Sequence, residues 1–152
     1  MGALLERIKS YLESHHVLTL ATGDEGGAWA ASLFYASDDA LNLYVLSDPA
    51  TRHGRAIAHD AIVAVTVHGE TREWMAIQGI QLRGAAGEVK EAEEVFARYT
   101  EKFPFVAALI PAGGPHRFYQ ITPRWIRLID NSQGLGFKEE ISLDSPDAGG
   151  SA

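Results

Sequence analysis

Apolar side chains follow a helical period at the start of the chain and a strand-like pattern after it. Over residues 3–14 they recur every three or four positions with charged residues opposite, which predicts an amphipathic helix. The following segments are rich in β-forming residues and separated by short turns containing Gly or Asp, which predicts strands at 16–22, 28–36 and 41–47. Because the connecting loops are short, these three strands are expected to form an antiparallel meander.

The rest of the chain adds further strands and a few helices. The expected elements are a helix at 49–59 with Asp48 as its cap, a strand at 61–67 that could be buried on both faces, a long strand at 74–88, a helix at 90–102, a short helix within 103–115, strands at 116–122 and 124–130, and a short strand within 136–143. Antiparallel strands of modest length that contain glycines favour a barrel over an open sheet. We therefore expect a mainly β domain over residues 1–143 with helices in its connections, followed by a flexible tail at 144–152.

Composition and charge narrow the function classes. The 152 residues suit one domain, and a formal net charge of −7 disfavours binding to nucleic acid or to an anionic membrane surface. The chain has no cysteine, which excludes disulfides and thiolate metal sites and fits a reducing compartment, so we expect a cytoplasmic protein. No apolar run approaches the roughly 20 residues of a membrane span. The spacing of the histidines does not indicate a metal site.

A cationic cluster follows the third expected strand, in the stretch LSDPATRHGRAI. On a helix that begins near Pro49, the side chains of Arg52, Arg55 and His59 fall along one face, and Thr51 lies in the first turn. The first turn of a helix also presents unpaired backbone N–H groups, a combination that binds phosphate. A solvated helix face whose arginines pair with nearby carboxylates has the same spacing. The residues alone therefore leave a phosphate site and an ordinary surface both open.

Four stretches, taken in order, carry a resemblance to a known family. They are HHVLTLAT, SLFYASDDALNLYVLSDPATRHGRAI, IQGIQLRGAAGEV and ITPRWIRLIDNSQGLGFKEEI. In the order and spacing of these stretches the chain resembles the FMN-binding split-barrel superfamily, the fold of pyridoxamine 5'-phosphate oxidase, and it looks most similar to the YhbP-like subgroup. The resemblance implies a six- to seven-stranded antiparallel split β-barrel that forms a homodimer, with FMN in a groove between the subunits.

The resemblance also implies which residues line that groove. A Ser-Arg-Lys triplet that contacts the phosphate in the oxidases corresponds here to Thr51, Arg52 and His53, of which His53 departs from the pattern. Because a neutral imidazole carries less charge than an ammonium group, we expect weaker, pH-dependent phosphate binding, with Arg55 compensating. The other implied cofactor-binding residues are Ser32, Leu33, Phe34, Tyr35, Leu46 and Ser47 on the second and third strands, Gln78 and Gln81 on the long strand, and Trp125, Asn131 and Lys138 near the C-terminal end.

Three function classes stay open. The first is an FMN-dependent oxidoreductase with a small-molecule electron donor or acceptor, for which the residues nominate no catalytic acid or base. The second is a protein that binds heme or a deazaflavin in the same barrel, and the third is a dimer that keeps the fold without a cofactor. The substrate-binding Arg and His pattern of true pyridoxamine 5'-phosphate oxidases is not recognisable, which argues against a role in vitamin salvage.

Overall fold

The computed structural model describes residues 2–111 and 113–143. The elements in chain order are α1 (Gly2–Ser14), β1 (Val17–Asp24), β2 (Gly27–Ser37), β3 (Leu43–Ser47), α2 (Arg52–His59), β4 (Ile62–His68), the short 3-10 helix η1 (Trp74–Ala76), β5 (Gln78–Glu88), α3 (Glu93–Lys102), α4 (Val106–Leu109), β6 (Arg117–Asp130), the short 3-10 helix η2 (Asn131–Gln133) and β7 (Lys138–Ser142). The expected tail at 144–152 lies outside the described residues.

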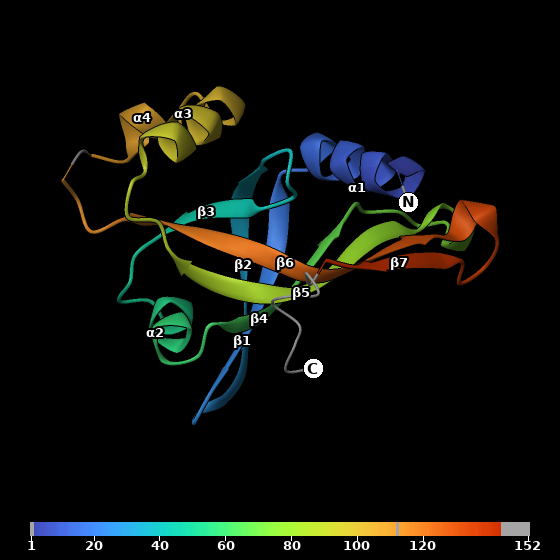
Figure 1. The fold of residues 1–152 in the computed structure, drawn as a ribbon, viewed down its shortest axis with the longest axis horizontal. Helices are drawn as coiled ribbons and strands as arrows, with labels where there is room; N and C mark the ends of the chain where they lie inside the picture. Colours follow the sequence, from blue (N-terminus) through green and yellow to red (C-terminus); the bar gives the residue numbers. More distant parts are fainter. Residues whose placement is uncertain (1, 112, 144–152) are drawn as a thin grey trace.

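The strands form a closed antiparallel barrel with one strand added. They are hydrogen-bonded in the order β3-β2-β1-β4-β5-β6-β7, and β3 also pairs with β6, so that β7 alone stands outside the closed ring (Figure 1). One edge of β6 pairs with two strands: residues 117–121 pair with β3, and residues 125–129 pair with β7. This arrangement confirms the predicted six- to seven-stranded antiparallel barrel with helices in its connections.

Side chains alternate between the interior of the barrel and its outer surface. The expectation that the strand at 61–67 is buried on both faces is wrong, because β4 buries Val63, Val65 and Val67 and exposes the residues between them. This alternation is typical of antiparallel sheets, which pack one face and leave the other accessible. The outer face of β4 is therefore available for contacts with another molecule.

Helix α1 packs against the interior of the barrel. Its Ile8 and Leu12 are fully buried and belong to the same apolar core as the inward side chains of the strands. Tyr35 of β2 is also fully buried, and its hydroxyl donates a hydrogen bond of 2.7 Å to the carbonyl oxygen of Leu12. The periodic apolar face predicted for residues 3–14 is thus the face that α1 buries.

The two strands expected on either side of Pro123 form the single strand β6. A proline lacks the N–H that a sheet ladder requires, which is why the sequence indicates a break at this position. In the structure Pro123 lies opposite Gly84, where the register of β5 shifts. A Cβ atom on Gly84 would lie 2.2 Å from the carbonyl oxygen of Thr122, so the absence of a side chain lets the two backbones approach and lets β6 continue.

Helix α2 begins at Arg52 rather than at Pro49, and Asp48 is not its cap. The Asp48 carboxylate instead accepts a hydrogen bond of 2.8 Å from the N–H of Ala50, which forms a turn before the helix. Thr51 is the N-cap, with its hydroxyl accepting from the N–H of Gly54. Because of this turn, the helix starts three residues later than expected, and its first residue, Arg52, lies beside the β1–β2 hairpin.

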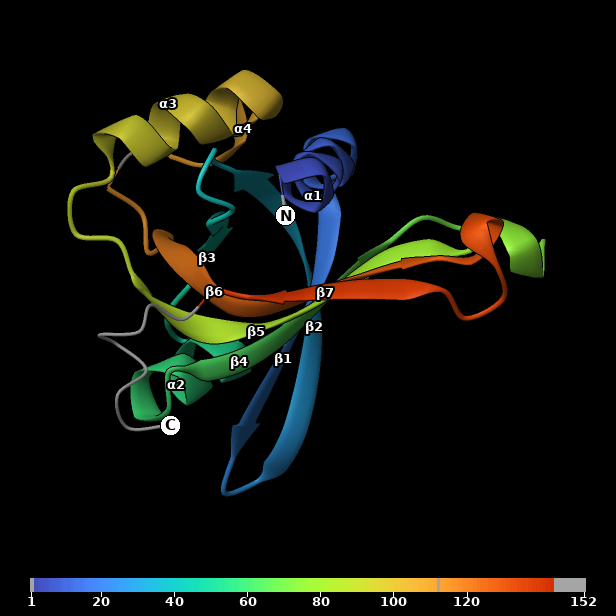
Figure 2. The same cartoon turned by 45° about the vertical axis from the view of Figure 1, so that its right-hand side comes forward.

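Two parts extend beyond the barrel. Helices α3 and α4 pack on its outside through a second apolar cluster that includes Tyr99 and Phe103 of the α3 region and Phe118 of β6. The ends of β5, β6 and β7, together with η1 and η2, form an arm that projects from the barrel on the side away from α3 and α4 (Figure 2).

Candidate functional site

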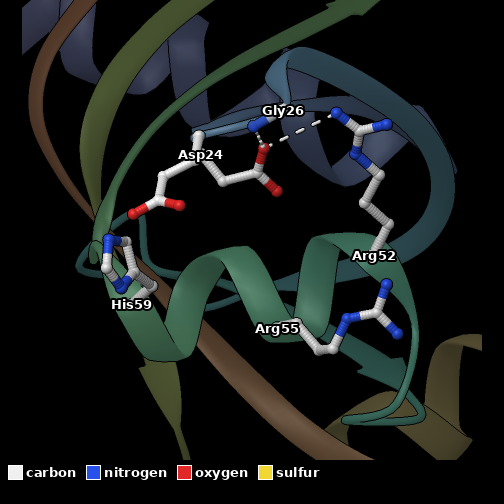
Figure 3. A pocket seen from close by; sticks show the side chains of 6 residues that line it. Asp24, Gly26, Arg52, Arg55 and His59 are labelled. Carbon is white, nitrogen blue, oxygen red and sulfur yellow. Dashed lines mark hydrogen bonds and ion pairs between the residues drawn. The ribbon is translucent and has the colours of Figure 1, made fainter.

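The turn of the β1–β2 hairpin and helix α2 enclose a surface cavity of about 460 Å³. The lining residues come from both elements and are Asp24, Glu25, Gly26, Arg52, Arg55 and His59. Figure 3 shows Asp24 and Gly26 on the hairpin turn, with Arg52 reaching toward them from α2. The structure therefore brings the three predicted basic side chains of the helix face to one cavity, and it adds two carboxylates that the sequence did not place there.

Arg52 is held by three residues of the hairpin. Its Nη2 atom lies 3.5 Å from Oδ1 of Asp24, and its guanidinium carbon lies 4.4 Å from the centre of the Trp29 ring. The side chains of Arg52 and Asp24 are only 33% and 26% exposed, so this pair is better shielded than an ordinary surface ion pair. A Cβ atom on Gly26 would lie 3.0 Å from Nη2, which leaves little room for a side chain at that position. The guanidinium is thus positioned at the cavity by the hairpin.

The start of α2 supports the site through its backbone. The Thr51 hydroxyl donates to the carbonyl oxygen of Asp48 at 2.7 Å and accepts from the N–H of Gly54 at 3.1 Å, so both of its functions serve the helix cap. A Cβ atom on Gly54 would lie 2.8 Å from the carbonyl oxygen of Pro49, so this glycine allows the helix to start close to the preceding turn. Arg55 is exposed and donates to the carbonyl oxygen of Ala50 at 2.8 Å.

His53 faces away from the cavity. Its side chain is 8% exposed, and its Nε2 atom lies 2.6 Å from Oγ of Ser47, which is also buried. Burial lowers the pKa of His53, so the imidazole is neutral at neutral pH. The pair therefore links β3 to α2 inside the protein. The sequence carried a signal for this orientation, because His53 precedes the apolar residues Ala56 and Ile57 at helical spacing.

The residues proposed for the flavin ring on β2 divide between the two faces of the strand. Ser32 and Phe34 point outward, and Phe34 is 51% exposed, whereas Leu33 packs against the core and Tyr35 is fully buried. Burial raises the pKa of the Tyr35 hydroxyl well above its usual range. On β3, Leu46 packs against the cluster under α3 and α4.

The two glutamines of the long strand also separate. Gln81 lies opposite Arg127 on the outer face and accepts a hydrogen bond of 3.3 Å from its Nη1 atom. Trp125 lies on the same face, with the guanidinium carbons of Arg83 and Arg127 each 4.9 Å from its ring centre. Gln78 is exposed and donates to Asp130 at 3.2 Å. The outer arginines are neighbours of Trp125 that the sequence did not single out.

Several candidates share one continuous outer face of the sheet. The strand registers place the following outward residues side by side across β2, β1, β4, β5 and β6: Ser32, Thr19, Thr66, Gln81 and Arg127. The next row consists of Ala30, Ala21, Ala64, Arg83 and Trp125. The second row is small and apolar over β1, β2 and β4, and its Ala30 and Ala64 are exposed.

Two candidates near the C-terminal end lie on the arm. Asn131 is buried, donates from Nδ2 to the carbonyl oxygen of Trp74 at 2.8 Å, and accepts from the N–H of Gly136 at 3.0 Å. It therefore fixes η1 to the turn before β7. Lys138 is exposed on β7, opposite Ile129.

Neither a metal cluster nor a membrane-spanning helix is found in the described part of the chain. No group of three or more His, Asp or Glu side chains there could hold a metal ion. None of its helices is long and apolar enough to cross a membrane.

The closed barrel, with β6 shared between β3 and β7, defines a split-barrel protein. The family model for pyridoxamine 5'-phosphate oxidase matches residues 4–130, and the chain belongs to that family. The UPF0306 protein of Enterobacter sp. (strain 638) is 34% identical over 137 residues, which cover 88% of this chain and 93% of that protein. The UPF0306 protein YhbP of Escherichia coli O157:H7 is 33% identical, with 88% and 90% covered. The resemblance predicted from the sequence is confirmed.

Solved structures share the fold at low identity. A heme-binding protein from Mycobacterium smegmatis matches with a TM-score of 0.71 at 19% identity, over 88% of this chain and 56% of that one. An FAD-binding protein from Mesorhizobium loti matches with a TM-score of 0.67 at 20% identity, over 83% and 90%. Proteins of this fold thus include both flavin and heme binders.

Proposed function

We propose that this protein binds FMN and acts as a flavin-dependent oxidoreductase, with the phosphate of the cofactor held at the start of α2. The observation that carries the proposal is the cavity at Arg52 and Arg55 in a chain of the pyridoxamine 5'-phosphate oxidase family. Guanidinium groups and the first turn of a helix are the donors that proteins use for phosphate. Arg52 and Arg55 therefore fit the phosphate end of FMN.

Within this proposal the residues at the cavity have different tasks. Arg52 and Arg55 would contact the phosphate, while Thr51 holds the first turn of α2 in place because its hydroxyl is engaged in the cap. His53 would support the site from inside through Ser47. Bound FMN would supply the electron transfer, and the protein would supply position and electrostatics. A small-molecule donor or acceptor would exchange electrons with it, and we nominate no acid or base.

We also propose a homodimer that uses the outer face of the sheet. Exposed apolar side chains lie at both ends of that face. Val17 and Phe34, 45% and 51% exposed, pair beside Thr19 and Ser32, and Ile62, 55% exposed, lies two residues from Ala64. Exposed apolar surface is typical of association sites. Ser32, Phe34, Gln81 and Trp125 would then lie at the subunit interface, beside the flavin ring. Sedimentation should show a dimer, and a monomer that retains FMN would contradict a groove shared by two subunits.

The absorption spectrum of the purified protein separates the candidate cofactors. We expect the flavin bands, either as purified or after addition of FMN. A Soret band after addition of heme, without flavin binding, would favour heme as the cofactor. The shared fold with the heme-binding protein from Mycobacterium smegmatis supports this second candidate. A deazaflavin would have its own, blue-shifted absorption. Protein that binds none of the three would overturn the proposal and favour a cofactor-free dimer.

A substitution at Arg52 tests the phosphate site directly. Arg52→Ala should weaken FMN binding by about 1.5–3 kcal/mol, the scale of a hydrogen bond to a charged group, which corresponds to roughly 10- to 150-fold in Kd. Arg72→Ala is the matched control, because Arg72 is exposed and lies outside the cavity. If both variants bind FMN like the wild-type protein, Arg52 does not contact the phosphate.

A further inference from the structure

Asp24 stands at the centre of the candidate site although it has the wrong charge for a phosphate. It is the last residue of β1, and its Oδ1 atom accepts a hydrogen bond of 2.7 Å from the N–H of Gly26. The same oxygen lies 3.5 Å from Nη2 of Arg52. One carboxylate oxygen therefore shapes the hairpin turn and faces the guanidinium that is proposed to bind phosphate.

The surroundings of Arg52 keep this pair together. The centre of the Trp29 ring lies 4.4 Å from the guanidinium carbon. The side chain of Asp24 is 26% exposed to solvent and that of Arg52 is 33% exposed. An arginine between a carboxylate and an aromatic ring loses little freedom when it binds an anion, because its side chain is already ordered. The hairpin therefore preorganises Arg52.

The charges of the arginines and carboxylates that line the cavity cancel. Arg52 and Arg55 contribute two positive charges to its lining, and Asp24 and Glu25 contribute two negative ones. A phosphate that approaches Arg52 must share it with Asp24 or displace the carboxylate, and in either case it meets a like charge at close range. The shielding of the pair makes this repulsion stronger than it would be between two fully solvated groups.

We propose that Asp24 is a specificity-determining residue of this site, an internal counter-ion that sets the affinity for phosphorylated ligands. Without a ligand it neutralises and orders Arg52. With a ligand it opposes the negative charge of the phosphate and has no effect on the uncharged parts of the molecule. This role rests on the proposed function, since it assumes that Arg52 receives the phosphate. It makes the cavity selective for ligands whose other contacts offset the opposing charge, and poor at retaining inorganic phosphate.

The substitution Asp24→Asn tests this role, because an amide oxygen can still accept the hydrogen bond from Gly26 while the charge is removed. Binding of FMN and of riboflavin, which lacks the phosphate, is measured by titration calorimetry. We expect Asp24→Asn to tighten FMN binding about tenfold and to leave riboflavin binding unchanged. Glu70→Gln is the matched control, since it removes the same charge from an exposed residue outside the cavity, and it should change FMN binding about twofold or less.

Each outcome bears on the inference. Equal or weaker FMN binding by Asp24→Asn, in a protein that still binds FMN through Arg52, would overturn the role of Asp24 and leave the proposed function intact. Equal tightening of FMN and riboflavin would also overturn it, because the effect would then not involve the phosphate. If wild-type protein and all variants fail to bind FMN, both proposals fail. Asp24→Ser, which keeps an oxygen for the turn, provides the same comparison if the asparagine variant melts at a lower temperature.

Discussion

The buried pair of Ser47 and His53 should contribute measurably to the stability of the protein, and Ser47→Ala isolates its contribution. In the wild-type protein, Oγ of Ser47 lies 2.6 Å from Nε2 of His53, which is only 8% exposed. The substitution removes that oxygen atom and leaves Nε2 of His53 buried without a hydrogen-bond partner. A buried polar group without a hydrogen bond costs about 1–3 kcal/mol. For a protein of this size each kcal/mol corresponds to roughly 2–4 °C in Tm. We therefore expect Ser47→Ala to lower Tm by several degrees.

The same pair predicts a dependence of stability on pH. Burial holds the pKa of His53 below its ordinary value of 6.5, so the unfolded chain takes up the proton at a higher pH than the folded protein does. The free energy of unfolding is then fully retained above pH 6.5 and falls as the pH drops from there toward the lowered pKa of the folded state. His53→Gln removes the titrating group and with it this part of the pH dependence.

Urea unfolding followed by circular dichroism at several pH values between neutral and mildly acidic measures both effects. Ser10→Ala is the control for Ser47→Ala, because Ser10 is exposed on α1 and its substitution should change stability by less than about 0.5 kcal/mol. The stabilising role of the Ser47–His53 pair is contradicted if Ser47→Ala is as stable as Ser10→Ala, or if His53→Gln loses stability with falling pH as steeply as the wild-type protein. FMN affinity provides a second check: a loss in His53→Gln as large as in Arg52→Ala would mean that His53 matters to phosphate binding as much as Arg52 does.

Two further substitutions test the barrel and the arm. Gly84→Val should lower the free energy of unfolding by about 1–3 kcal/mol through overpacking, because its Cβ atom would lie 2.2 Å from a backbone carbonyl oxygen. Gly87→Val is the control and should be tolerated, because no atom lies within 4 Å of a Cβ atom at that position. Equal melting temperatures of the two variants would contradict the close approach at Gly84. Asn131→Ala removes hydrogen bonds to Trp74 and Gly136, so amide hydrogen exchange should quicken in η1 and in the turn before β7, and unchanged exchange there would show that the arm is held in another way.

Most of the fold follows from local patterns, and two of the exceptions depend on contacts between distant segments. Helical and alternating periods predict the elements because they depend on neighbouring residues, and the turns between β1, β2 and β3 contain the residues that turns require. The continuity of β6 across Pro123 depends on Gly84, which is distant in sequence, and the closure of the barrel depends on β3 and β6, which are separated in the chain by β4 and β5. Such contacts between distant segments leave no periodic signal.

The candidate site divides in the same way. The shared position of Arg52, Arg55 and His59 follows from the geometry of one helix, and the structure places all three at the cavity. The contacts of Arg52 with Asp24 and Trp29 bring together segments far apart in the chain, so the spacing of charges on α2 could not predict them. Each of the two interpretations of the basic helix face agrees with part of the structure. Arg52 pairs with a carboxylate, as on an ordinary surface, and the pair lies at the edge of a cavity, as a phosphate site requires.

The inward position of His53 changes how the match to the oxidases applies to this chain. If a lysine stood at position 53 in this backbone, its ammonium group would start from a buried Cα that faces Ser47, and it would have to leave the core to reach the cavity. Replacing His53 by lysine should therefore destabilise the protein rather than strengthen phosphate binding. The cationic character of the site depends instead on Arg52 and Arg55, and the charge that opposes them belongs to Asp24. In the proposed phosphate site, ligand affinity would then be set at the contact between the hairpin and the helix, by one carboxylate and one guanidinium.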